Sequence, residues 1–266
     1  MLTQERHQTI VELVKKNKFI KTGDLAAALG VAEVTIRRDL RLLAERGILQ
    51  KVYGGVTTVD DGGGIELPLS NRRAEHQAEK RAIGRAAMEL IADDTAIALD
   101  AGTTTIELAR LLPARKNLTV VTHSLDIALE LMDNPNLNLI LTGGVVRSRT
   151  HALIGPLAEG ALARFKVQKS FVAVSGIDLE GGLSVTNLLE IPLKQRLLAA
   201  GEEVIILADS SKIGKTSFAH LASLDQAHRL ITDAGIHPEH RQQLEARGIT
   251  ITIAPPELLP AGGGWV

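Results

Sequence analysis

The chain has 266 residues, of which 45% are hydrophobic and 23% charged, a globular composition long enough for about two domains. It has no cysteine, which excludes disulfides, thiolate metal sites and cysteine nucleophiles, and no apolar run long enough to span a bilayer. Residues 1–55 carry 10 basic and 6 acidic residues, whereas the rest of the chain is acidic overall. This basic end indicates an acidic partner, and because no signal-peptide pattern is present we expect a cytoplasmic protein.

Three helices are expected in the N-terminal segment. Apolar residues among polar neighbours predict a first helix over residues 3–15, and a short second helix from Gly23 to Leu29. Gly30 ends the second helix, since glycine is common just past a helix C-terminus. A third helix is expected from Ala32 to Arg46, followed by a β-prone stretch over residues 48–53. Two short helices joined by a tight turn are typical of a helix-turn-helix.

The third helix has one apolar face and one basic face. Ile36, Leu40 and Leu43 recur at a spacing that places them on the same inward side. Arginine suits the major groove, because its planar fork binds guanine or phosphate oxygens two at a time. A solvated helix surface is the alternative when the arginines are considered alone. The candidate DNA-binding residues on the outward side are Thr35, Arg37, Arg38 and Arg41.

The β-prone stretch after this helix suggests a wing. Lys51 and Tyr53 are expected to reach the DNA backbone from it, although Tyr53 is equally suited to pack against the first helix. Aromatic residues make up only 2% of the chain, which argues against stacking on single-stranded nucleic acid. Duplex DNA is therefore the expected partner of a DNA-binding domain over residues 1–56.

The remainder of the chain predicts an α/β domain. Residues 57–71 have the composition of a linker, with three consecutive glycines and a proline. Buried strands alternating with helices indicate a mainly parallel sheet covered on both faces, here over residues 72–256. Residues 257–266 are expected to form a loose tail. The apolar runs that define the strands are 96–99, 118–121, 137–141, 171–174, 204–207, 230–231 and 249–253.

A loop of small residues follows the first of these strands. A strand, such a loop and a helix N-terminus together can bind an anion through free N–H groups and hydroxyls. An ordinary turn with threonine caps is the alternative, and the loop is not a Walker A loop because no Gly-Lys-Ser/Thr follows. The candidate ligand-binding residues in this loop are Asp100, Gly102, Thr103, Thr104 and Thr105.

Further candidates follow other strands, because ligands of open α/β sheets bind beyond the carboxyl ends of the strands. Arg147 and Lys212 are expected to supply positive charge, and Asp178 to accept from sugar hydroxyls together with Asp100. For each charged residue a surface ion pair is the alternative. Glu190 and Lys194 have the spacing of a surface pair on a helix, and contact with the ligand is the alternative for both. His123 ends a strand, where it can be a hydrogen-bonded structural residue or a titrating one.

Three segments of the chain closely resemble the DeoR family of bacterial transcriptional regulators, and the similarity extends over nearly the whole chain. These segments are Arg6-His7-Gln8-Thr9-Ile10, Gly30-Val31-Ala32-Glu33-Val34-Thr35-Ile36-Arg37-Arg38-Asp39-Leu40 and Gly54-Gly55. The resemblance implies a winged helix-turn-helix followed by a Rossmann-like sensor domain that resembles ribose-5-phosphate isomerase. It also implies a repressor of carbohydrate catabolism, a phosphorylated sugar as effector, a homodimer or homotetramer, and no cofactor or metal.

The resemblance also assigns roles to single residues. It implies that Lys212 contacts the phosphate. Asp39 matches the family, and we expect it to hold an arginine in place rather than touch DNA, because DNA would repel its charge. The family usually has serine at the position of Ala32, where it would cap the recognition helix. It often has histidine at the position of Tyr53, which is a second departure.

An isomerase-like enzyme with a DNA-binding appendage is the alternative function. The Gly-Ile-Asp at residues 176–178 resembles the Gly-Ala-Asp-Glu of the isomerase, but Leu179 replaces its acidic neighbour. A lysine-containing glycine loop is also missing after it. Because function depends on the site rather than on the fold, the sequence predicts a regulator without catalytic residues.

Overall fold

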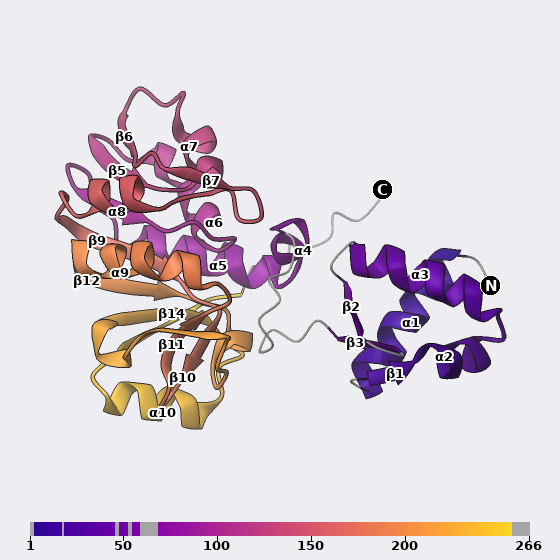
Figure 1. Ribbon diagram of the computed structural model, residues 1–266. Coiled ribbons are helices and arrows are strands. Elements are labelled where there is room, and N and C mark those ends of the chain that lie inside the picture. The colour runs from indigo at the N-terminus through magenta and orange to yellow at the C-terminus, as the bar shows by residue number, and fades with distance from the viewer. Residues whose placement is uncertain (1–2, 18, 46–47, 53–54, 59–68, 257–266) are drawn as a thin grey trace, which may run out of the picture. The chain divides into compact units, whose positions relative to one another are not determined.

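A computed structural model describes residues 3–17, 19–45, 48–52, 55–58 and 69–256. The chain divides into two compact units, residues 1–72 and 73–266 (Figure 1). Most of the expected linker and the whole expected tail, together with Tyr53, lie outside the described residues. In the part of the chain that is described, no helix combines the length and the apolar character needed to cross a bilayer.

The first unit is a winged helix-turn-helix. Its strands form an antiparallel sheet in the order β1-β3-β2, of which β1 is an element that the sequence did not predict. Gly30 adopts a left-handed conformation, φ 63°, and its N–H closes the end of the second helix. The inward face expected of the third helix is confirmed, because Ile36, Leu40 and Leu43 are buried in one core. The elements are α1 (Thr3–Asn17), β1 (Phe19–Lys21), α2 (Thr22–Leu29), α3 (Glu33–Glu45), β2 (Leu49–Val52) and β3 (Gly55–Thr58).

The second unit alternates strands and helices, as the sequence predicts. Its first half consists of α4 (Leu69–Ala74), which straddles the unit boundary, α5 (Gln77–Met88), β4 (Ala96–Leu99), α6 (Thr105–Ala109), η1 (Leu112–Ala114), β5 (Leu118–Thr122), α7 (Leu125–Leu131), β6 (Leu137–Leu141), β7 (Val145–Arg147), β8 (Ala152–Ile154) and α8 (Pro156–Leu162). Its second half consists of β9 (Val167–Ala173), β10 (Gly176–Asp178), β11 (Gly182–Val185), η2 (Leu188–Glu190), α9 (Ile191–Ala200), β12 (Gly201–Leu207), η3 (Ser210–Lys212), β13 (Ala219–Ala222), η4 (Leu224–Gln226), β14 (Arg229–Asp233), α10 (Pro238–Ala246) and β15 (Thr250–Ala254).

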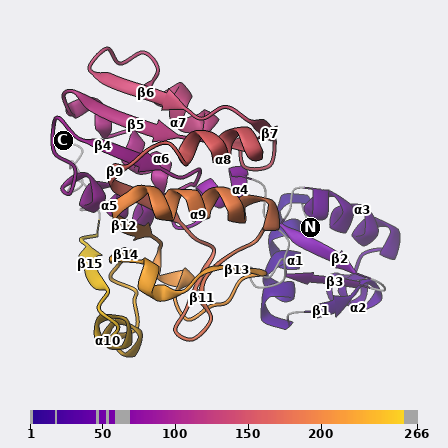
Figure 2. The same cartoon turned by 60° about the vertical axis from the view of Figure 1, so that its left-hand side comes forward.

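The expected parallel sheet is confirmed. Within the described residues seven strands pair in the order β15-β14-β12-β9-β4-β5-β6, and every neighbouring pair is parallel. Successive side chains of a strand point to opposite faces, so Ile97 and Leu99 pack in one core while Ala98 packs in the other. Helices α5, α6 and α7 cover the first face, and α8, α9 and α10 the second. Figure 2 shows α8 and α9 lying over the strands.

Two small sheets were not predicted. β7 and β8 form an antiparallel hairpin, and β10, β11 and β13 form a second antiparallel sheet. These strands are three or four residues long, too short for alternation of polar and apolar residues to identify them. At the turn between β10 and β11, Gly182 has φ +77° and lies against the carbonyl of Ala222, where a side chain would clash.

Candidate functional site

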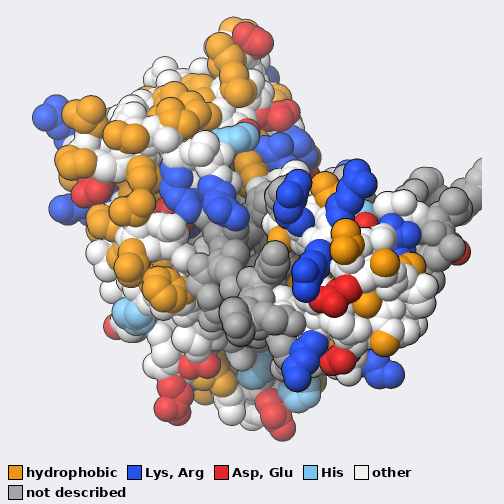
Figure 3. Space-filling view, turned by 45° about the vertical axis from the view of Figure 1, so that its right-hand side comes forward, with side chains coloured by type: hydrophobic (Ala, Val, Ile, Leu, Met, Phe, Trp, Pro, Cys, Tyr) orange, Lys and Arg blue, Asp and Glu red, His pale blue; other side chains and the backbone are white. Residues whose placement is uncertain are grey.

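The recognition helix presents the expected basic surface. Arg37, Arg38 and Arg41 are exposed on α3, and Thr35 is half-buried beside them. Arg37 forms an ion pair of 2.7 Å with Glu33 one turn earlier. Figure 3 shows Lys and Arg side chains on the visible surface of this unit. Lys51 lies in β2, the strand of the wing.

Asp39 fixes α3 to the first helix. Arg6 Nε donates to Asp39 Oδ2 at 2.6 Å, and His7 Nε2 lies 3.0 Å from Oδ1. Burial alone would raise the pKa of Asp39, but the hydrogen bonds from Arg6 and His7 outweigh it and hold that pKa below its ordinary value. The residue therefore holds an arginine, as expected, and fixes α3 against α1.

The start of α3 lacks a side-chain cap. The N–H of Ile36 donates to the carbonyl of Ala32 at 3.2 Å, but Ala32 offers no side-chain oxygen to the free N–H groups of the first turn. We expect Ala32→Ser to stabilise the first unit by about 1 kcal/mol, measured by urea unfolding of the full chain followed by circular dichroism. Ala27→Ser, on the exposed side of α2, is the matched control. It should leave the free energy of unfolding unchanged or lower it by a few tenths of a kcal/mol. An equal effect of both substitutions would contradict the capping argument.

The second unit has its switch point between β4 and β9. From β4 the chain adds β5 and β6 on one side of the sheet, then returns to add β9, β12, β14 and β15 on the other. Open α/β sheets generally bind ligands at the carboxyl ends of two such neighbouring strands, from which the chain continues in opposite directions. Asp100 follows β4 at this place, and Ala173 ends β9.

A buried ion pair lies at the switch point. Lys194 Nζ of α9 donates to Asp100 Oδ2 and, at 2.8 Å, to the carbonyl of Ala173. The N–H of Ala173 donates to the same carboxylate oxygen at 2.9 Å. The sequence interpretation of Lys194 as the surface partner of Glu190 is therefore wrong, because its charge is neutralised inside the fold by a residue 94 positions away. The pair ties the loop after β4 to α9.

His123 lies against this pair. Its Nε2 is 3.4 Å from Asp100 Oδ1 and 3.4 Å from the N–H of Ala101, whereas its Nδ1 has no hydrogen-bond partner among the described residues. Burial lowers the pKa of His123 to about 4, the attraction of Asp100 opposes this, and the repulsion of Lys194 adds to it. The ring is therefore neutral near pH 7.

The threonine loop is packed tightly against β9. Thr105 Oγ1 donates to the carbonyls of Asp100 at 2.7 Å and of Gly102 at 3.0 Å, so this threonine braces the loop. A Cβ at Gly102 would lie 2.8 Å from the Cβ of Ala173, which requires glycine there. Thr104 precedes α6 but makes no side-chain capping bond, so the alternative of a purely capping threonine does not describe it. Thr103 is buried beside it.

Arg147 and Glu190 form a second, nearly buried ion pair. Arg147 Nη1 donates to Glu190 Oε1 at 3.0 Å and to Thr150 Oγ1 at 3.1 Å. Glu190 ends η2, is the N-cap residue of α9 and precedes Lys194 by one helical turn. The two ion pairs together place β7, η2, α9 and the loop after β4 side by side.

Lys212 lies in η3, directly after β12 and therefore also at the carboxyl edge of the sheet. The turn is fixed from two sides: Asp209 Oδ1 accepts the N–H of Ser211 at 3.2 Å, and Asp233 Oδ2 accepts the N–H of Ser210 at 2.6 Å. Sequence reasoning missed Asp233, although its place at the end of a strand is the signal used for the other loops.

The carboxylate of Asp178 is held by the turn that follows it. Its Oδ1 accepts the N–H groups of Gly181 at 2.6 Å and of Glu180 at 3.0 Å, and these bonds lower its pKa. The turn it belongs to adjoins Asp225 and Arg247, which precede β14 and β15, so the turn lies toward the amino ends of those strands. The residue before it, Ile177, pairs with Ile213, the residue after Lys212, so Asp178 stays beside the loop that follows β12 while its carboxylate closes its own turn.

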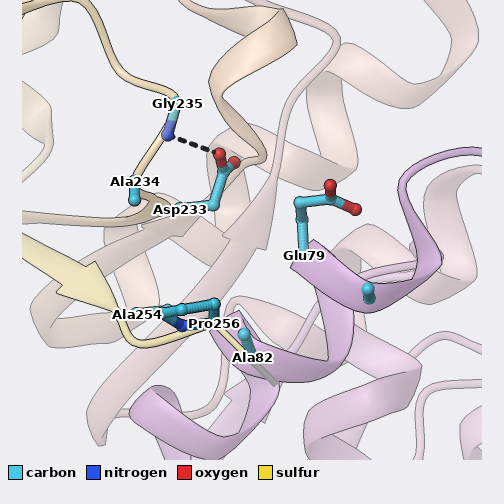
Figure 4. Close-up of a pocket in the computed structure, with 8 residues that line it drawn as sticks. Glu79, Ala82, Asp233, Ala234, Gly235, Ala254 and Pro256 are labelled. Carbon is cyan, nitrogen blue, oxygen red and sulfur yellow. Dashed lines mark hydrogen bonds between the residues drawn. The ribbon is translucent and has the colours of Figure 1, made fainter. Parts of the chain in front are cut away.

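A cavity of about 360 Å³ lies at the carboxyl ends of β14 and β15. Figure 4 shows the carboxylate of Glu79 and that of Asp233 on its walls. Asp233 Oδ1 accepts the N–H of Gly235 at 2.8 Å, and the rest of the wall is largely apolar. Among the described residues no group of three His, Asp or Glu is placed to hold a metal ion. The lining residues are Ala78, Glu79, Ala82, Asp233, Ala234, Gly235, Ala254 and Pro256.

Comparison with known proteins agrees with this architecture. The DeoR-like helix-turn-helix domain matches residues 6–61, and the DeoR C terminal sensor domain matches residues 75–234. The HTH-type transcriptional regulator GlpR of Haloferax volcanii is 36% identical over 94% of this chain and 98% of its own length. The glycerol-3-phosphate regulon repressor of Escherichia coli is 31% identical over 88% of this chain and 92% of its own.

Solved structures similar to the chain include ribose 5-phosphate isomerase A of Methanocaldococcus jannaschii, with a TM-score of 0.38 and 16% identity over 50% of this chain and 53% of the isomerase. The family matches cover both units, and the relatives match over nearly their whole length. The chain belongs to the DeoR family of helix-turn-helix transcriptional regulators.

Proposed function

We propose that the protein represses a carbohydrate-utilisation operon, and that a phosphorylated sugar or polyol bound by the second unit changes its affinity for operator DNA. The observation that carries this proposal is the occurrence, in one chain, of an exposed arginine face on α3 and of polar loops at the switch point of an α/β sheet. The relatives named for glycerol-3-phosphate and for the aga operon support the class of effector. A homodimer or homotetramer supplies the two or more recognition helices that paired half-sites require.

DNA binding is assigned to Thr35, Arg37, Arg38 and Arg41, with Lys51 and Tyr53 as candidates on the wing. The test uses a DNA duplex that the wild-type protein selects from a random pool. We expect Arg38→Ala to weaken the binding free energy for this duplex by roughly 1–3 kcal/mol, because an arginine contact to base or phosphate is lost. Fluorescence anisotropy over a series of salt concentrations measures the loss and shows whether the salt slope falls with it. Arg196→Ala, an exposed charge on α9, is the matched control. Unchanged affinity of both Arg38→Ala and Arg41→Ala would refute the assignment.

The effector is assigned to the carboxyl edge of the sheet at the switch point. Residues Gly102 to Thr105 offer backbone N–H groups and hydroxyls, and Lys212 and Arg147 offer positive charge for a phosphate. Asp100 is placed to orient the ligand through the loop that it fixes. We leave Asp178 out of the proposed pocket because its carboxylate already accepts the N–H groups of Glu180 and Gly181.

We expect a sugar phosphate, and not its parent sugar, to raise the thermal unfolding midpoint of the full chain. A ligand at about 100 times its dissociation constant adds roughly 2.7 kcal/mol to the stability of the unit that it binds. A panel of sugar and polyol phosphates, with the parent compounds and inorganic phosphate as controls, identifies the ligand. Lys212→Ala should abolish the shift while Lys215→Ala, an exposed neighbour, should keep it. A shift that survives in Lys212→Ala would contradict the proposed pocket.

We also propose that the ligand is bound and not converted. A base that moves a proton between sugar carbons works best with a pKa near the working pH, whereas backbone hydrogen bonds lower the pKa of Asp178. Incubation of concentrated protein with the stabilising ligand should leave aldose and ketose phosphates unchanged. Turnover at a rate proportional to protein concentration would favour the isomerase alternative.

A further inference from the structure

Val34 is an exposed aliphatic side chain on the basic surface of α3. It is 76% exposed, whereas Ile36 and Leu40 of the same helix are 0% and 1% exposed. Among the residues of the first unit whose side chains the structure describes, the next most exposed large hydrophobic one is Ile48, at 36%. The basic surface therefore contains an apolar group that phosphate binding does not explain.

Val34 lies on the same side of α3 as two of the candidate arginines. Val34, Arg38 and Arg41 follow at intervals of four and three residues, which places them along one face of a helix. Ile36 is rotated from Val34 by about 200° around the axis and is buried in the core. That core and the hydrogen bonds of the buried Asp39 fix the rotation of the helix. The side chain of Val34 therefore points away from the unit, in the direction of the arginines.

Val34 belongs to the first turn of this helix. α3 begins at Glu33, and the N–H of Ile36 donates to the carbonyl of Ala32 at 3.2 Å. In a helix-turn-helix, the N-terminal residues of the recognition helix are those that contact base edges in the major groove. The carboxylate of Glu33 lies 2.7 Å from Arg37, so the acidic charge beside Val34 is already paired. Val34 is therefore placed among the residues that read bases rather than among those that only approach the backbone.

The chemistry of the side chain selects its partner on the DNA. Valine has no side-chain donor or acceptor, so it forms no hydrogen bond with a phosphate or with the polar edge of a base. The apolar group in the major groove is the C5 methyl of thymine, which apolar side chains contact. This contact removes apolar surface from water and leaves no polar group unpaired.

We propose that Val34 is a specificity-determining residue that contacts the C5 methyl group of a thymine in the operator. The proposal rests on the proposed use of α3 for DNA binding, and adds to the arginines a contact that depends on the base and not on charge.

Duplexes that differ by a single methyl group test the proposal. The duplex that the wild-type protein selects from a random pool is remade with deoxyuridine in place of one thymine at a time, which removes the C5 methyl and keeps the hydrogen bonds of the base pair. At the thymine that Val34 contacts, the wild-type affinity measured by fluorescence anisotropy should fall about fourfold, as expected for one buried methyl group. Val34→Ser should bind the unmodified duplex more weakly, and deoxyuridine at that position should then cost less than about twofold.

Thr35→Ser is the matched variant, because it removes a second methyl group from the start of α3 and keeps the hydroxyl. It should retain the full sensitivity to deoxyuridine at the position where Val34→Ser loses it. Val34→Ser should also leave the salt slope of binding unchanged, since an uncharged side chain releases no counterions. Thermal unfolding of both variants checks that the first unit is still folded.

A wild-type protein that is insensitive to deoxyuridine at every thymine overturns the proposal. So does a sensitivity that Val34→Ser retains in full, or one that Thr35→Ser removes in its place. In each of these outcomes the wild type still binds its selected duplex, so the assignment of the arginines to DNA stands. A wild type that selects no duplex refutes that assignment, and the thymine contact with it.

Discussion

Replacing Lys194 by alanine is expected to destabilise the α/β unit by about 3–5 kcal/mol, because it leaves a buried carboxylate without its counter-charge. Asp100 is fully buried, and the remaining donor to its Oδ2 is the N–H of Ala173. The carbonyl of Ala173 loses a partner as well. Urea unfolding of the full chain, followed by circular dichroism, measures the loss in the transition of this unit.

A double substitution tests whether the unpaired charge of Asp100 is the cause of this destabilisation. Lys194→Met combined with Asp100→Asn removes both charges at similar volume and should be much less destabilising than Lys194→Ala, since a buried pair contributes little beyond the desolvation it offsets. Arg196→Ala, an exposed residue of the same helix, should change stability by about 0.5 kcal/mol or less. A loss below about 1 kcal/mol for Lys194→Ala would contradict the burial of the pair.

Acidification is expected to cost the same unit about 3 kcal/mol between pH 6.5 and pH 4 through His123 alone. The unfolded chain takes up a proton on this residue as the pH falls through 6.5, whereas the folded chain resists it until the pH reaches about 4. The unfolded state therefore binds more protons in this window, and stability falls with the pH. Asp100 and Lys194, which face the ring, are the charges that modify its pKa.

His123→Asn isolates this effect. Other groups titrate equally in the variant and the wild type, so the difference in unfolding free energy between the two proteins reports His123. The wild type should lose stability relative to the variant as the pH falls from 6.5 to 4, and the difference should level off below pH 4. A difference that does not depend on pH would show that the ring is accessible to protons in the folded state.

The sequence predicted the features that arise from local periodicity. The inward face of α3 and the alternation of apolar strands with helices both follow from spacings of a few residues, and both are confirmed. The loop from Asp100 to Thr105 was identified because it follows directly on a strand.

Features that depend on the order of strands were not predicted. Lys194 was assigned to Glu190 because residues four apart on a helix are neighbours, but β9 lies between β4 and β12 and brings α9 to Asp100. Asp178 was expected to bind the ligand because it follows β9; the sequence did not show that the chain forms the antiparallel pair β10–β11 there, whose turn engages this carboxylate. Alternation of strands and helices specifies a parallel sheet without specifying which strands adjoin.

The separation of 94 residues between Asp100 and Lys194 has a consequence during synthesis. The first unit has its own core within residues 1–72, so it can fold while the ribosome is still making the rest. The central strand β4, by contrast, waits for β9 and then for α9 before the loop after it is fixed. A transcript that ends before the codon for Lys194 therefore specifies a first unit with a complete core and an α/β unit whose central loop has no counter-charge for Asp100. Premature termination is then expected to leave a folded helix-turn-helix attached to an unfinished sheet.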